Sequence, residues 1–396
     1  MDSLSNTLQT APFRQNRHHR INVILLVIVT LVALLLVFRP VFIHLRAAGL
    51  LLRIQDPKRS GIIASLHTYP VVERLTEVAT SSGTIRARLY IPQGVSNAPG
   101  MVIVHGVHHL GIEEPRLVRF ARAMSASGFR VMTPELAALA DYRVDPQCIA
   151  LIGYSARSLS ADIGQRVGVL GLSFAGGLSL LAASDPQYAP YIRSVISVGA
   201  HDDLERVSGF LISNSIQRPD GSTLQMAAHE YGPLVLIYSH VEDFFPAADV
   251  NVARDALRLL LWEQVDDSRK QAERLSAPSR QKMDLLYKHD VEALDSEMKQ
   301  AIVRHRADMA PVSPHGNLQT LRVPVLLLHG AADNVIPPSE LLWLEQDVPP
   351  GTLKNALIST AISHVSMEGE PSFADQFRLV HFMAQMLELT DDSRWR

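Results

Sequence analysis

Short apolar stretches alternate along most of this chain with longer segments of helical periodicity. Residues 71–78 and 84–91, on either side of Ser81-Ser82-Gly83, alternate apolar with polar side chains and predict an antiparallel hairpin with one exposed face. Later runs are apolar on both faces: 101–104, 130–133, 167–170, 194–198, 323–328 and 356–359. Helical patterns such as 115–127 and 146–152 separate them. We therefore expect an α/β fold, with a mostly parallel sheet that helices cover on both faces.

Two segments before the last strands are less regular. Residues 232–243 fit either a strand or a helix, and Pro233 in the first turn favours the helix. Residues 246–314 are charged and poor in glycine, with leucines at helical spacing, such as Leu257, Leu260 and Leu261. This pattern predicts a helical insertion between the sixth and seventh core strands.

Near the N-terminus, residues 21–38 form an uninterrupted apolar run of about the length that spans a bilayer. A basic cluster precedes it: Arg14, Arg17, His18, His19 and Arg20. We predict an uncleaved membrane anchor. A cleaved signal peptide is the alternative, but its apolar region is shorter, and no small-residue cleavage site precedes Arg39-Pro40.

The basic cluster also bears on orientation. Arg39, Arg46 and Arg53 nearly balance it on the far side, but the tighter N-terminal cluster favours a cytoplasmic tail over 1–20 and places the rest of the chain on the outer face. Residues 39–70 are then expected to form a juxtamembrane linker. Within it, residues 41–54 could continue the helix along the membrane surface.

Composition narrows the possible partners. The chain is 47% hydrophobic and 19% charged with a net charge of −3, which fits a globular protein and argues against a nucleic-acid partner. The single cysteine, Cys148, excludes an intramolecular disulfide and is expected in the core.

The most specific motif is Gly171-Leu172-Ser173-Phe174-Ala175-Gly176, which directly follows the apolar run 167–170. Small residues flank Ser173 because a tight turn from strand to helix leaves no room for side chains there. The motif predicts a nucleophile elbow. The same pattern also arises by chance where a buried strand meets a glycine-rich helix start, so its weight depends on the other segments.

A serine at neutral pH needs a base to accept its proton and a carboxylate to orient that base. Asp333 follows the strand 323–328, and His364 lies in the loop after the last strand. We assign Ser173, Asp333 and His364 to the catalytic groups. Asp202 and Asp203, which follow the sixth strand, are alternatives to Asp333 as the acid. His381 is a rival base, to which we give a structural role because Val380, Phe382 and Leu387 share its helical pattern.

From about Val71 to the C-terminus, these motifs resemble the α/β-hydrolase superfamily, and within it the bacterial dienelactone-hydrolase-like and acyl-peptidase-like serine esterases. The order Ser, Asp, His along the chain is that of this fold. Two positions depart from the family pattern: Ala175 replaces a glycine, and Ser363 precedes His364 where glycine is more usual.

The resemblance implies a core formed by residues 71–245 and 315–396, with 246–314 as a helical cap above Ser173. A peripheral helix pair without contact to the site is the alternative. The backbone N–H groups of Val107, after His105-Gly106, and of Phe174 would form the oxyanion hole. The side chains of His108, Trp262 and Leu285 would contact the substrate.

The resulting hypothesis is a membrane-anchored serine hydrolase that cleaves an ester, thioester or amide through an acyl-enzyme on Ser173. Its substrate would be a small acyl compound, lipid-like compounds included, and the chemistry needs no cofactor. No third ligand lies at metal-binding spacing from His108 and His109, so we expect no metal. There are two alternatives: an acyltransferase with the same triad, and a non-catalytic scaffold that binds a ligand or partner. The intact Ser, Asp and His argue against the scaffold.

Overall fold

A computed structural model describes residues 15–362 and 371–391, without the side chains of residues 15–21, 23 and 26–37. The strands are β1 (Val71–Thr80), β2 (Gly83–Pro92), β3 (Gly100–Val104), β4 (Arg130–Pro134), β5 (Val167–Leu172), β6 (Ile192–Val198), β7 (Ser215–Gln217), β8 (Thr223–Gln225), β9 (Val325–Gly330) and β10 (Leu353–Ser359). The helices are α1 (Gln15–Gln55), α2 (Ile62–Ser65), α3 (Pro115–Ala126), α4 (Ala137–Ala140), α5 (Gln147–Ile163), α6 (Phe174–Ser184), α7 (Leu204–Ser213), α8 (Gly232–Ser239), α9 (Val241–Phe244), α10 (Val250–Leu261), α11 (Val265–Ala272), α12 (Ala277–Tyr287), α13 (Asp295–Arg304), α14 (Arg306–Met309), α15 (Ser339–Asp347) and α16 (Phe373–Thr390).

Eight strands form one mixed sheet in the order β1-β2-β4-β3-β5-β6-β9-β10. β1 and β2 form the predicted hairpin, with Val71 opposite Pro92 and Thr80 opposite Gly83. β2 is also antiparallel to β4, and every later pair, from β4–β3 to β9–β10, is parallel. The prediction of a mostly parallel sheet is confirmed.

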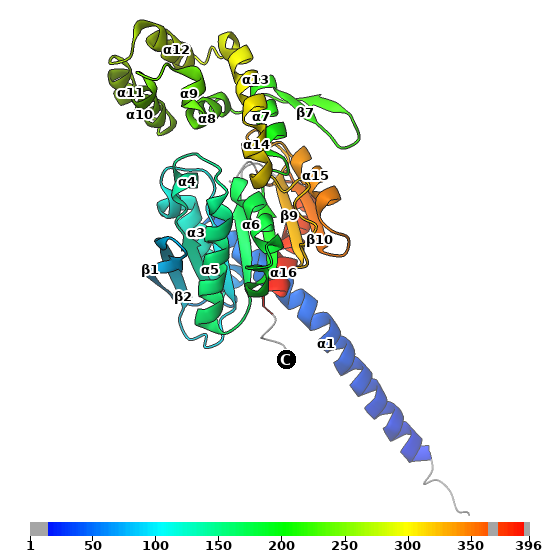
Figure 1. The fold of residues 1–396 in the computed structure, drawn as a ribbon. Helices are drawn as coiled ribbons and strands as arrows, with labels where there is room; N and C mark the ends of the chain where they lie inside the picture. The colour runs from blue at the N-terminus through cyan, green and yellow to red at the C-terminus, as the bar shows by residue number, and fades with distance from the viewer. Residues whose placement is uncertain (1–14, 363–370, 392–396) are drawn as a thin grey trace, which may run out of the picture.

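Helices cover both faces of this sheet, which explains why its strands are apolar throughout (Figure 1). Val102 and Val104 of β3 point into a core shared with α5, α6 and α15. Met101 and Ile103 of the same strand point the other way, into a core shared with α1, α3 and α16. Cys148 is buried in the first of these cores, as predicted.

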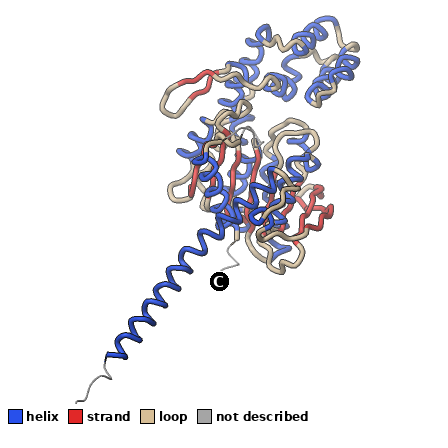
Figure 2. The backbone as a smooth tube through the Cα atoms, turned by 180° about the vertical axis from the view of Figure 1, so that it is seen from behind, coloured by secondary structure: helices blue, strands red, loops and turns tan. Residues whose placement is uncertain are grey.

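Helix α1 runs from outside the domain into this second core, where its C-terminal end packs against α16 and α3 (Figure 2). Ile43, Ala47 and Leu50 are buried there beside residues of α16 such as Phe382. The helix thus continues over 41–54 as expected, but the structure places this segment in the protein core rather than along a membrane surface. The reason lies in the helical spacing of those apolar residues, which puts them on one face.

Two buried arginines fix the same segment of α1. Arg46 lies 3.7 Å from the Asp391 carboxylate after α16 and donates to the Ser127 carbonyl. Arg53 donates to the Ala64 carbonyl at 2.6 Å and to the Ser127 hydroxyl at 2.6 Å. These contacts attach α1 to the segment after α16 and to the segment after α3, so residues 42–54 are part of the folded domain.

Among the side chains that the structure describes, no helix is both long and apolar enough to cross a membrane. Most side chains of residues 21–38 lie outside that description, so the predicted anchor stays a prediction.

An insertion between β6 and β9 carries α7 to α14 and the small hairpin β7–β8. It begins earlier than the predicted segment 246–314, because α7, the hairpin and α8 also belong to it. Residues 232–239 form helix α8, which confirms the preferred interpretation. The insertion has a hydrophobic cluster of its own, which includes Leu257, Met283 and Met298.

Three hydrogen bonds attach the insertion to the loop after β4. The Tyr142 hydroxyl donates to the Leu261 carbonyl at 3.0 Å. The Asp141 carboxylate accepts from the Tyr238 hydroxyl at 2.6 Å and from Arg258 at 3.0 Å. These contacts hold the helices α8 to α12 above the carboxyl ends of the strands (Figure 1).

Candidate active site

Ser173 stands at the turn between β5 and α6 with φ 56° and ψ −135°, a strained conformation for a residue with a side chain. The turn is too tight for a side chain at Gly171, because a β-carbon there would lie 2.3 Å from the Ala175 carbonyl oxygen. At Gly176, it would lie 2.6 Å from the Ser197 hydroxyl. The small residues of the motif are therefore required by packing, and the turn has the geometry of the predicted elbow.

The loop after β3 passes directly in front of Ser173. A β-carbon on Gly106 would lie 3.0 Å from the Ser173 β-carbon and 3.7 Å from its hydroxyl oxygen. Buried His105 fixes this loop: its Nε2 accepts from the Leu136 amide at 3.1 Å, and its Nδ1 donates to the Gly106 carbonyl at 2.7 Å. Burial lowers the pKa of His105, so the ring stays neutral. The backbone at Gly106 is thus held close to the serine.

Asp333 is fully buried in the loop that follows β9. Its Oδ1 accepts hydrogen bonds from the amides of Val335 and Ile336, both at 3.0 Å. His329 lies 3.4 Å from Oδ2 and donates to the Ile336 carbonyl at 2.9 Å. The two amide donors stabilise the ionised carboxylate. The same contacts, with the bond from His329 to the Ile336 carbonyl, hold the loop that carries Asp333 in place.

The alternative acids after β6 are engaged elsewhere. The Asp203 side chain caps α7, accepting from the amides of Glu205 and Arg206. Asp202 accepts from the Arg206 guanidinium at 2.8 Å, and Arg206 also donates to Glu340 of α15 at 2.6 Å. This network joins the end of β6, the insertion and α15.

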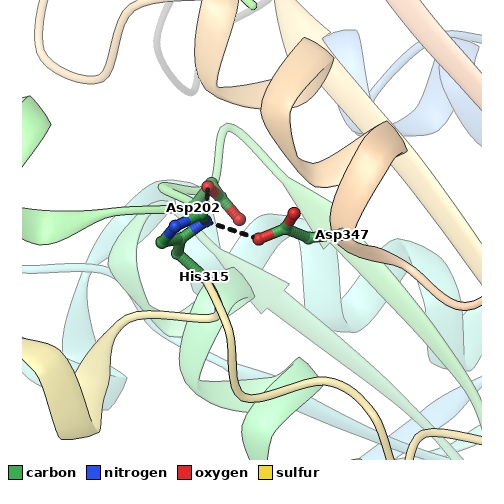
Figure 3. A group of neighbouring side chains, drawn as sticks. All are labelled: Asp202, His315 and Asp347. Atoms are coloured by element: carbon green, nitrogen blue, oxygen red, sulfur yellow. Dashed lines mark hydrogen bonds and ion pairs between the residues drawn. The ribbon is translucent and has the colours of Figure 1, made fainter.

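His315 extends this network and lies between two carboxylates (Figure 3). Its Nδ1 is 2.7 Å from Asp347 and 3.6 Å from Asp202. The three side chains have the spacing of a metal site. The Arg206 guanidinium already supplies positive charge at Asp202, so ion pairing accounts for the group. Burial raises the pKa of Asp202 to about 7.

Of the two candidate bases, only His381 lies among the described residues. It lies on α16, where its Nδ1 is 2.9 Å from the Nε2 of His44 on α1 and the two rings stack. This contact supports the structural role predicted for His381. His364 lies outside the described residues, so its role as the base stays a prediction.

Ser173 lies in the wall of a cavity of about 1040 Å³. Val107 and His108 also line it, and so do Tyr142, Leu261, Leu286 and Tyr287 at the junction with the insertion. These lining residues place the cavity between the strand ends and the insertion. Burial, with a smaller effect of His109, lowers the pKa of His108.

Two of the predicted substrate contacts lie beside the cavity rather than in its wall. Trp262 and Leu285 pack against the hydrophobic cluster of the insertion and are not among the lining residues. The Trp262 ring lies 5.4 Å from the His109 ring, which does line the cavity. Phe174 is buried with its ring 5.3 Å from that of His201. The roles of the Phe174 and Val107 amides stay predictions.

Several residues that line the cavity are not among those predicted from the sequence. Tyr231 is one: it precedes α8, and burial, with a smaller effect of the Asp333 charge, raises its pKa, so the phenol remains protonated. Leu51 and Ile54 of α1 and Met383 of α16 are others. The helical spacing of Ile43, Ala47, Leu50 and Ile54 is the signal that could have indicated a buried face of α1.

No family model and no curated protein matches the chain. Similar solved structures include the esterase domain of a Rhodothermus marinus protein, at 13% identity over 80% of this chain and 96% of that chain, with a TM-score of 0.40. An esterase from Pyrobaculum calidifontis is 13% identical over 82% of this chain and 86% of its own, with a TM-score of 0.42.

An acylaminoacyl peptidase from Pyrococcus horikoshii is likewise similar, at 13% identity over 84% of this chain, with a TM-score of 0.47. The match covers 43% of that peptidase, which is therefore much the longer protein.

The topology of the sheet identifies the fold independently of these comparisons. Numbered along the chain, its core strands have the order 1-2-4-3-5-6-7-8, with the second antiparallel to its neighbours. The strained serine follows the fifth strand, and the buried aspartate follows the seventh. With this strand order and these two positions, the chain has the α/β-hydrolase fold.

Proposed function

We propose that this protein is a serine hydrolase that cleaves an ester, thioester or amide through an acyl-enzyme on Ser173. One observation carries the proposal: Ser173 occupies a strained turn at the N-terminus of α6, in the wall of a large cavity and directly behind the Gly106 loop. Strain of this kind at a nucleophilic side chain that faces a cavity is typical of a catalytic site.

In the proposed reaction, the Ser173 oxygen attacks the substrate carbonyl carbon while His364 accepts the hydroxyl proton. The backbone amides of Val107 and Phe174 donate to the oxygen of the tetrahedral intermediate. His364 then protonates the leaving alcohol, thiol or amine as its bond to carbon breaks. Water hydrolyses the acyl-enzyme by the same steps. Asp333, held by two amide donors, orients His364 and stabilises its protonated form.

The insertion acts in this proposal as a cap. Its contacts through Tyr142 and Asp141 hold Leu261, Leu286 and Tyr287 over the cavity, where they exclude water from the reacting groups. Residues 21–38 anchor the enzyme in a membrane, with the N-terminus in the cytoplasm and the domain on the outer face.

Labelling with a fluorophosphonate probe tests the proposal. The wild type should be labelled and should hydrolyse short p-nitrophenyl esters, and Ser173→Ala should do neither. Ser184→Ala is the matched control, because it removes a buried hydroxyl at the other end of the same helix, where it donates only to the Leu180 carbonyl. Labelling of a folded Ser173→Ala protein, or its turnover at the wild-type rate, would show that another residue is the nucleophile.

A further inference from the structure

The cavity beside Ser173 extends well beyond the cap. One group of its lining residues lies on the face of the sheet that α1, α3 and α16 cover. Leu170 and Ile196 contribute from the sheet, Leu51 and Ile54 from α1, and Phe382 and Met383 from α16. This part of the cavity, which we call the α1 arm, runs between the sheet and the helices rather than under the insertion.

The two parts of the cavity differ in chemical character. Aliphatic, aromatic and thioether side chains line the α1 arm where it follows the sheet. The polar lining residues on this side belong to the end of α1 and the start of α3: Gln55, Glu114, Arg116 and Arg119. Glu114 and Arg116 are paired with each other at 2.7 Å. The part beneath the insertion carries ionisable side chains: His229, Glu230, Tyr231, Glu263 and His289. A ligand that fills both parts is therefore amphiphilic, because an unpaired polar group would lose its hydration in the α1 arm without gaining a hydrogen bond there.

The wall formed by α1 is fixed in place. Arg46 and Arg53 attach the helix on either side of Leu51, through Asp391, Ser127 and the Ala64 carbonyl. Leu50, the neighbour of Leu51, is fully buried in the core. The width of the arm is thus set by packed secondary structure, which gives it the rigidity that discrimination between ligands requires.

We propose that the α1 arm binds an unbranched aliphatic chain of the substrate. Helix α1, which continues from the predicted anchor, then determines which chain lengths fit the cavity. The natural substrate is then an amphiphilic ester, thioester or amide, with its chain against α1 and its polar half beneath the insertion. This proposal rests on the proposed function, because Ser173 lines the same cavity as the residues of the α1 arm.

The test uses the full-length protein in detergent and p-nitrophenyl esters from acetate to laurate. Leu51→Trp fills the arm, so kcat/KM for the long esters should fall relative to acetate, by about fourfold for each methylene displaced. Leu51→Ala widens the arm and should move the optimum toward longer chains. Leu45→Trp is the matched control: it lies on the same helix, is 39% exposed and is not a lining residue, so its profile should equal that of the wild type.

Opposite shifts in the two Leu51 variants support the proposal, since general damage to the fold would not produce them. A chain-length profile in Leu51→Trp and Leu51→Ala identical to that of Leu45→Trp would overturn it.

Binding of dansyl-undecanoic acid provides a readout that needs no turnover. Leu51→Trp should weaken binding of this probe, and Leu45→Trp should not. If the wild type failed to hydrolyse any ester, the proposed function would fail, while probe binding would still decide whether the arm takes a chain. Equal probe affinity in both tryptophan variants would refute the arm even in an active enzyme.

Discussion

The buried half of α1 makes the stability of the domain depend on where the N-terminal segment is cut. A chain that begins at Arg39 keeps Ile43, Arg46 and Leu50, whereas a chain that begins at Pro70 loses all three. We expect the first to fold and to leave the membrane fraction on carbonate washing. We expect the second to be unstable, although residues 39–70 are predicted from the sequence to be only a linker.

The magnitude follows from what these residues bury. Ile43 is 6% exposed and Leu50 is 0% exposed, so their removal from the core costs roughly 3–6 kcal/mol together. The ion pair between Arg46 and Asp391, whose side chains are each 3% exposed, is lost as well. A loss of this size is a large part of the whole stability of a typical domain, about 5–15 kcal/mol.

Urea unfolding followed by tryptophan fluorescence measures this effect, first on the two shortened chains and then on single variants of the full chain. Leu50→Ala should lower the free energy of unfolding by about 2–5 kcal/mol. Leu45→Ala, on the exposed side of the same helix, should change it by no more than about 0.5 kcal/mol. Equal midpoints for the two shortened chains, or for the two alanine variants, would refute the assignment of α1 to the core.

The remaining predictions concern three aspartates. Asp333→Asn should lower kcat for short esters by about 10³- to 10⁴-fold, because an amide favours the wrong tautomer of the base. Asp203→Asn, which keeps the cap of α7, should have little effect, and a larger loss from Asp203→Asn would move the acid to the end of β6. Burial raises the pKa of Asp202 from 3.8 to about 7, so the folded state binds more protons than the unfolded state between these values. Stability from this group is present at low pH and is lost as pH rises toward 7. Thermal unfolding of wild type and Asp202→Asn should therefore show a steeper loss of Tm in the wild type over this range, and equal slopes would contradict the assignment.

The sequence alone determined the features that depend on local pattern. Runs that are apolar on both faces predicted a covered parallel sheet, because strand residues alternate between two faces that both meet helices. The residues around Ser173 predicted the tight turn, because steric crowding within a few residues dictates glycine or alanine there. The place of Asp333 after a buried strand followed from the same local signals.

Tertiary structure alone decided which apolar side chains meet the cavity. Trp262 and Leu285 have the hydrophobic character of wall residues, but packing within the insertion turns them to its own cluster, and Leu286 and Tyr287 line the cavity instead. On α1, Arg46 and Arg53 made residues 41–54 resemble a surface helix. Both arginines are buried, and their partners lie elsewhere in the chain: Asp391 for Arg46, and the Ser127 hydroxyl and the Ala64 carbonyl for Arg53. Such partners come together only in the folded chain, since no local pattern records which distant residue will neutralise a charge or fill a cavity.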